Sequence, residues 1–180
     1  MGLQIDNYGN RLSGIYSQPN CTEANVRITG GDNRLSNFDI KVAANKIGID
    51  VTTQHNQLSN GKLSLAAGAT GIRLANGNNP GVWCVTDVSV SGAGNGTAIE
   101  CSDPINDAVI EVYCHGVAVG LDLNEEGTSR LGSGNRINVR TFSVATPIDL
   151  PRGWQNTTER KTTNQIFIDG RQYWPARDEF

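Results

Sequence analysis

Five short segments of the chain each place a charged residue between two apolar ones. The charged residues are Asp50, Arg73, Glu100, Asp122 and Asp149. Such alternation predicts strands whose apolar residues face a core and whose central residue faces outward. If these strands stack as neighbours, the last three charged residues form a ladder of carboxylates. Paired carboxylates are the groups that supply the acid and the base or nucleophile in glycoside hydrolysis.

The spacing of the ladder suits two mechanisms. Adjacent members would lie about 5 Å apart, near a retaining pair, and Glu100 and Asp149 would lie about 10 Å apart, roughly the inverting range. Stacked like charges should raise the pKa of at least one member. Glu100, Asp122 and Asp149 are therefore the candidate catalytic residues. The alternatives are solvated carboxylates, an interface with a neighbouring subunit and a cation site, and Arg73 could pair with Asp50 or Glu100. Solvated or interface carboxylates are the favoured interpretation.

A second apolar position precedes each of these strands at a constant distance. The leading residues are Ile40, Leu63, Val90, Val112 and Val139, and the lagging residues are Ile49, Ile72, Ile99, Leu121 and Ile148. Each pair is nine residues apart, whereas successive leaders are 23, 27, 22 and 27 residues apart. This pattern predicts a coil of stacked turns with a fixed corner. The loops at 75–84 and 124–135 are expected to absorb the variation in length.

Composition agrees with an all-β chain of one domain. Glycine is abundant (21 residues), the net charge is −3, and no long apolar run is present. We therefore expect neither nucleic-acid binding nor membrane insertion. The four cysteines include no CxxC pair and only two histidines occur, so no metal site or cofactor is expected. Cys84, Cys101 and Cys114 are interpreted as small buried hydrophobic residues, and His115 as a hydrogen-bonded structural residue.

Aromatic residues near loops and in the tail form a second set of candidates. Together with Arg73, the expected glycan or partner contacts are Trp83, Trp154, Tyr173 and Trp174. Aromatic rings beside polar groups can stack on sugar faces. Tyr173 and Trp174 could equally cap the open end of the coil, because solenoids need capped ends. The predicted organisation is an N-terminal cap or attachment segment (1–24), a coil (25–170) and a C-terminal tail or cap (171–180).

Two motifs carry a resemblance to a known fold family. They are the Gly-Ile/Leu-x-apolar strands at 48–51, 71–74 and 120–123, and the Asn-containing strand entries at 36–38 and 134–137. Over residues 25–170 the chain resembles the right-handed β-helices of the pectate-lyase-like superfamily, bacteriophage tailspikes and tail fibres in particular. The resemblance implies a single-stranded right-handed parallel β-helix of about five to six turns. It also implies a homotrimer in a virion.

The expected function follows from that resemblance. It is a virion structural or receptor-binding protein, assembled in the host cytoplasm, that attaches to a host surface polysaccharide or to a neighbouring virion protein. The N-terminus lacks the features of a secretory signal, in agreement with this expectation. The alternative is a polysaccharide depolymerase, a glycoside hydrolase or lyase that uses the carboxylate ladder. The short coil favours the non-catalytic function.

Overall fold

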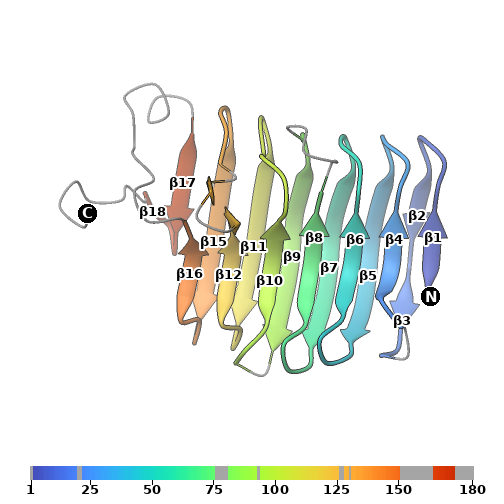
Figure 1. Ribbon diagram of the computed structural model, residues 1–180, viewed down its shortest axis with the longest axis horizontal. Helices are drawn as coiled ribbons and strands as arrows, with labels where there is room; N and C mark the ends of the chain where they lie inside the picture. Colours follow the sequence, from blue (N-terminus) through green and yellow to red (C-terminus); the bar gives the residue numbers. More distant parts are fainter. Residues whose placement is uncertain are drawn as a thin grey trace.

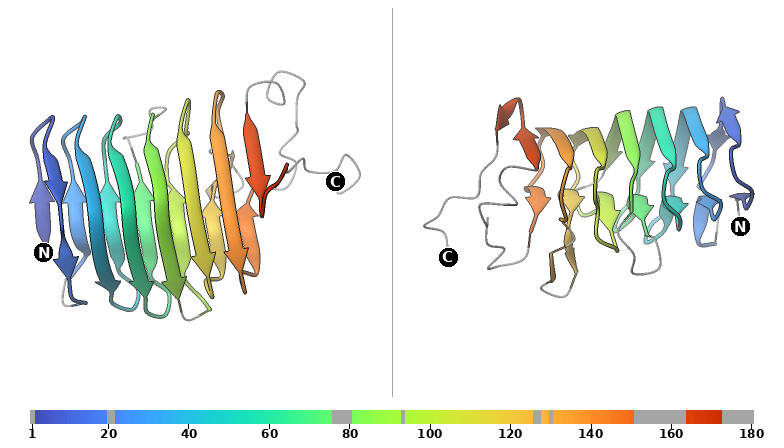
Figure 2. Two further views of the ribbon diagram at one scale, coloured as in Figure 1. Left: turned by 180° about the vertical axis from the view of Figure 1, so that it is seen from behind. Right: turned by 90° about the horizontal axis from the view of Figure 1, so that it is seen from above.

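The chain folds into a parallel β-solenoid of about six turns, seen in a computed structural model (Figure 1). The structure describes residues 2–19, 22–75, 81–92, 94–125, 128–129, 131–150 and 164–172. From the N-terminus onward, the chain rises along the front strands and descends along the rear ones (Figures 1 and 2). This sense of winding is right-handed, as predicted. The described part contains no helix, hence none long and apolar enough to cross a membrane.

Two long sheets form the walls of the coil. The first sheet has the order β1 (Leu3–Ile5), β4 (Ala24–Ile28), β6 (Ile47–Val51), β8 (Thr70–Leu74), β10 (Thr97–Cys101), β12 (Val119–Asp122) and β16 (Thr146–Asp149). The second sheet comprises β2 (Arg11–Ser13), β3 (Tyr16–Ser17), β5 (Arg34–Val42), β7 (Gln57–Leu65), β9 (Cys84–Gly92), β11 (Val109–His115), β15 (Arg136–Phe142), β17 (Gln165–Ile168) and β18 (Arg171–Gln172). A two-stranded hairpin of β13 (Asn124–Glu125) and β14 (Thr128–Ser129) lies between β12 and β15.

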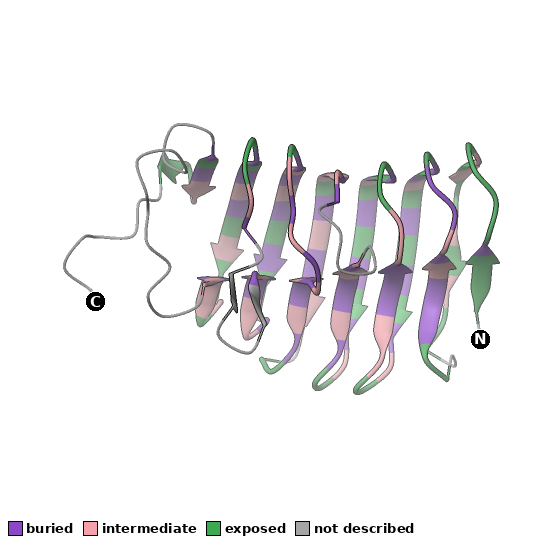
Figure 3. Ribbon diagram, turned by 45° about the horizontal axis from the view of Figure 1, so that its top comes forward, coloured by how far each residue is buried: buried purple, intermediate pink, exposed green. Residues whose placement is uncertain are grey.

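Alternate residues of these strands fill the space between the sheets. In β7, for example, Leu58, Leu63 and Leu65 are buried whereas Lys62 and Ser64 are exposed. Figure 3 shows this alternation as bands of buried and exposed residues along the long strands of the second sheet. The predicted inward and outward faces of the strands are thus confirmed. Burying apolar side chains in every turn is what stabilises a solenoid, since each turn contacts only its neighbours.

Strand pairing confirms one of the two predicted columns. In the first sheet Asp50 pairs with Arg73, Arg73 with Glu100, Glu100 with Asp122, and Asp122 with Asp149. The column also continues toward the N-terminus through Arg27.

The other predicted column is wrong beyond its third member. Ile40, Leu63 and Val90 do pair in register, but Val90 faces Cys114, and Val112 faces Val88. The corner therefore has nine residues from Val90 to Ile99 but seven from Cys114 to Leu121. Val112 and Val139 do pair with each other, but they lie two residues before Cys114, the residue that faces Val90. The nine-residue spacing from Val112 to Leu121 is therefore a coincidence. It arises because Val112 and Cys114 both face inward and lie two residues apart.

A β-bulge also disappears at the same place. Asn37, Asn60 and Asp87 occupy the same position in three successive turns, with positive φ angles of 53°, 52° and 54°. Asn and Asp tolerate this left-handed conformation better than other side chains do. In β11 the bulge is absent, so Thr86 and Asp87 together face the single residue Glu111. The long connections at 75–84 and 124–135 do join the first sheet to the second, but they do not absorb all the length variation.

Buried asparagines hold successive turns together where the second sheet begins. The Oδ1 atom of Asn33 accepts a hydrogen bond from the backbone N–H of Asn10 at 2.8 Å, and that of Asn56 accepts one from Asn33 at 2.9 Å. Asn135 accepts from the N–H of Ala108 at 3.0 Å in the same way. These side chains satisfy backbone groups that bend away from the sheet ladder.

The remaining sequence predictions have mixed outcomes. Cys101 and Cys114 are buried free thiols as predicted, and Cys84 is half-buried. Burial raises the pKa of Cys114 to about 12 and shifts that of Cys101 upward as well. Residues 3–17 pair with the next turn and form the start of the coil. Whether either end acts as a cap or an attachment segment stays a prediction.

Candidate functional site

The first member of the charged column is a structural ion pair. Asp50 is fully buried between two arginines of the neighbouring strands. Arg73 donates from Nε to Oδ1 and from Nη2 to Oδ2, both at 2.9 Å, and Arg27 donates to Oδ2 at 3.1 Å. Hydrogen bonding to Asp50 raises the pKa of Arg73. Arg73 thus pairs with Asp50, one of the two partners considered for it, and its guanidinium is already engaged.

The carboxylate ladder is formed as a set of neighbours in register. Glu100, Asp122 and Asp149 are all half-buried on the outer face of the first sheet. Glu100 accepts hydrogen bonds from Ser102 Oγ at 3.0 Å and Thr70 Oγ1 at 3.3 Å. The structure therefore brings the three predicted catalytic residues together, and their role in catalysis stays a prediction.

The predicted contact residues separate into two groups. Trp83 lies in the core with 2% of its surface exposed, and its indole N–H donates to the carbonyl of Thr53 at 2.8 Å. It directly precedes Cys84, which pairs with Gln57, so its position along the strand corresponds to that of Asn56 in the preceding turn. A ring buried in this way is not a stacking surface, so Trp83 is a core residue. Trp154, Tyr173 and Trp174 lie outside the described residues.

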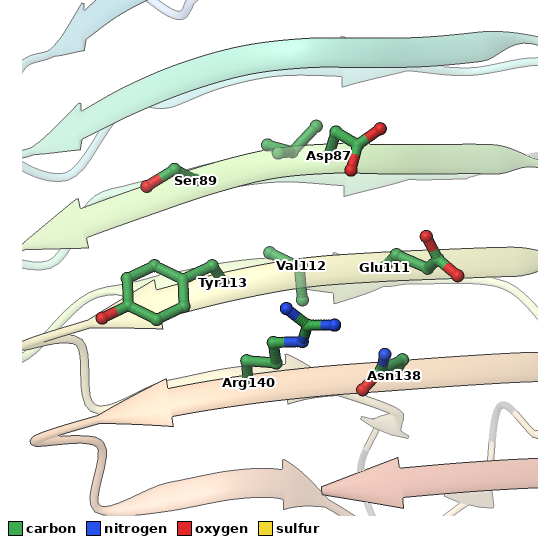
Figure 4. A pocket seen from close by; sticks show the side chains of 8 residues that line it. Asp87, Ser89, Glu111, Val112, Tyr113, Asn138 and Arg140 are labelled. Atoms are coloured by element: carbon green, nitrogen blue, oxygen red, sulfur yellow. The ribbon is translucent and has the colours of Figure 1, made fainter. Parts of the chain in front are cut away.

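The second sheet carries a depression that the sequence patterns did not indicate. It has a volume of about 340 Å³ and lies over β9, β11 and β15, where the bulge is lost (Figure 4). Its polar lining residues are Asp87, Ser89, Glu111, Tyr113, Asn138 and Arg140. A bulge bends its strand and redirects side chains. The change from a bulged to a regular strand therefore places these side chains around a shared hollow.

One polar atom in this depression has no partner. The Oδ1 atom of Asn138 is buried and accepts no hydrogen bond, the only such side-chain atom among the described residues. A buried acceptor without a donor costs roughly 1–3 kcal/mol. Arg140 stands nearby, opposite Tyr113 on the next strand, and forms no ion pair within the described residues. Among the described residues, Glu111 has only a long contact, 3.9 Å, with Arg136. The depression thus offers an unpaired cation and a weakly paired carboxylate, whereas the Oδ1 atom of Asn138 is closed to solvent.

Exposed aromatic rings flank the depression on β11 and β15. Tyr113 is 47% exposed and Phe142 is 60% exposed. His115 is exposed at the end of β11, and its ring meets that of Phe142 edge-on with centroids 5.1 Å apart. The prediction of a hydrogen-bonded structural histidine is not supported by this environment. Outward alternation along β11 could have placed Tyr113 on the outer face of the sheet, because successive residues of a strand face opposite sides.

Two further depressions follow the same sheet toward the N-terminus. One of about 420 Å³ includes His55, Gln57 and Cys84, and one of about 330 Å³ includes Arg11, Arg34 and Gln57. Gln57 contributes to both hollows. The outer face of the second sheet is therefore indented along most of the length of the coil.

The three depressions together present polar side chains along the second sheet. Within the described ranges, no group of three or more His, Cys, Asp or Glu residues could hold a metal ion. Comparison with known proteins gives no match: no protein-family model, no curated protein and no solved structure is significantly similar to this chain. The functional argument therefore depends on the geometry of this molecule.

Proposed function

We propose that this protein is a glycan-binding β-solenoid that attaches to a surface polysaccharide through the outer face of its second sheet. The observation that carries the proposal is the exposed ring of Tyr113 in one hollow with Arg140, whose guanidinium forms no ion pair within the described residues. A sugar hydroxyl would find an acceptor in the carboxylate of Glu111, whose contact with Arg136 is long. The guanidinium of Arg140 can in turn donate to sugar oxygens, and the exposed ring of Tyr113 can stack on a sugar face.

The shape of the surface supports an extended ligand. The three depressions lie along one sheet, and successive strands are about 4.8 Å apart. A polysaccharide chain that runs along the coil axis would cross one strand after another and meet each hollow in turn. By the resemblance in the sequence, the proposal extends to a virion attachment protein that works as a homotrimer. Neighbouring virion proteins are further partners of the stiff coil.

Arg140→Gln tests the central hydrogen bond. Because Arg140 is exposed and forms no ion pair within the described residues, the substitution should leave stability unchanged while lowering glycan affinity. Tyr113→Ala should lower the affinity about three- to tenfold through lost stacking. Tyr8→Ala is the matched control, since Tyr8 is 73% exposed and lies outside the depression.

Binding is measured first on a glycan array and then by calorimetry with the best oligosaccharide. A protein that binds no glycan, or whose affinity is unchanged in both depression variants, would refute the proposal. The depolymerase alternative has a separate readout. Release of reducing ends or unsaturated sugars, lost in Asp122→Asn, would assign catalysis to the carboxylate ladder of the first sheet.

A further inference from the structure

Two arginines stand directly opposite each other at the N-terminal end of the second sheet. Arg11 on β2 pairs in register with Arg34 on β5, and both side chains are exposed. Within the described part of the chain, neither guanidinium forms an ion pair. Like charges at directly opposite positions of a sheet destabilise it. This pair therefore has an electrostatic cost that nothing described in the structure offsets.

Other cations of the coil are placed differently. Arg73 and Arg27 share the buried carboxylate of Asp50. On the same outer face as the arginine pair, Lys62 stands opposite Asp39. The Arg11–Arg34 pair is thus a local concentration of positive charge in a chain whose net charge is −3.

Hydroxyl groups lie beside the arginine pair. Ser13, Ser36 and Ser59 occupy one register column on β2, β5 and β7, and with both arginines they line the depression of about 330 Å³. The Oγ atom of Ser13 accepts a hydrogen bond from Asn37 Nδ2 at 2.9 Å. Its own hydroxyl proton therefore remains able to donate. The hollow presents N–H and O–H donors around two positive charges.

We propose that this hollow is an anionic subsite that binds a carboxylate or sulfate ester of an acidic polysaccharide. A guanidinium presents a planar fork of donors that matches both anions. One anion between the two arginines would also remove their mutual repulsion. The inference deepens the proposed function and depends on it: the glycan that follows the second sheet carries negative charge.

The experiment compares three probes: oligogalacturonate for carboxylates, dextran sulfate for sulfate esters, and neutral dextran. The full chain should bind at least one acidic probe and bind neutral dextran more weakly. Arg11→Gln/Arg34→Gln should lower the affinity for that acidic probe about tenfold. The loss should shrink as salt is raised. Lys41→Gln/Lys62→Gln is the matched control, because it removes two exposed positive charges from the same sheet without touching the hollow.

The outcomes separate the two proposals. An equal loss in the lysine control would show general electrostatic attraction and would overturn the subsite. Equal affinity for neutral and acidic probes would overturn it too, while leaving glycan binding intact. Failure of every glycan, on the array and among these probes, would refute both proposals. An oligomer that dissociates only in the arginine variant would instead assign the pair to a contact between copies of the chain.

Discussion

Neutralising Asp50 tests the claim that the charged column is structural at its N-terminal end. Three N–H donors point at this carboxylate, and Asp50→Asn replaces one acceptor oxygen with a donor. At least one Arg73 hydrogen bond then becomes a contact between two donors, and Arg73 loses its counter-charge, whereas Arg27 keeps its ion pair with Glu23 at 3.1 Å. Breaking a buried ion pair costs about 3–5 kcal/mol. The guanidinium side chains are 29% and 33% exposed, so water recovers part of this. We expect a loss of about 2–4 kcal/mol in the free energy of unfolding.

Urea denaturation followed by circular dichroism measures this loss. Asp39→Asn is the control, because Asp39 is an exposed aspartate on β5, and its effect should stay below about 0.5 kcal/mol. The triple variant Arg27→Met/Asp50→Leu/Arg73→Met should recover most of the stability, since the cost comes chiefly from the Arg73 guanidinium left without an anion. A single Asp50→Asn variant as stable as the Asp39→Asn control would refute the reasoning.

Three further predictions concern the core and its hydrogen bonds. Asn135→Ala should destabilise the coil by about 2–4 kcal/mol, because it leaves the buried N–H of Ala108 without an acceptor. Urea denaturation measures this loss, and a value below about 1 kcal/mol would contradict the stabilising role of the buried asparagines. Trp83→Phe should lower stability by about 1–3 kcal/mol through loss of its hydrogen bond to Thr53, yet leave glycan affinity unchanged in calorimetry. A weakened affinity would show that Trp83 does contact the glycan. For Cys114, the folded-state pKa of about 12 lies above the ordinary thiol pKa of 9.0, so its stabilising contribution is complete below pH 9 and is lost as pH rises toward 12. Stability measured by urea between pH 9 and 11 should therefore fall less steeply in Cys114→Ala, by about 1.4 kcal/mol per pH unit, and identical slopes would contradict the burial argument.

Much of the charged column could be predicted because its strands are short and clearly bounded. Apolar–charged–apolar triplets mark Asp50, Arg73 and Glu100 as outward residues, and glycines at 48 and 71 mark where two of the strands begin. The burial of Asp50 was not predicted. It depends on Arg27 from the preceding turn, which lay outside the five aligned segments, and on two arginine side chains folding over one carboxylate.

The sequence alone determined the fold class, the inward and outward faces and the stacking of the short strands, because alternation with a period of two is a local property. The register of the long strands was decided only in three dimensions. Val112 and Cys114 both face inward, so a slip of two residues leaves the apolar pattern unchanged, and only backbone pairing distinguishes the two alignments. That slip, together with the lost bulge at Asp87, places Glu111, Tyr113 and Asn138 around the depression. For this reason, the sequence patterns did not predict the proposed binding site.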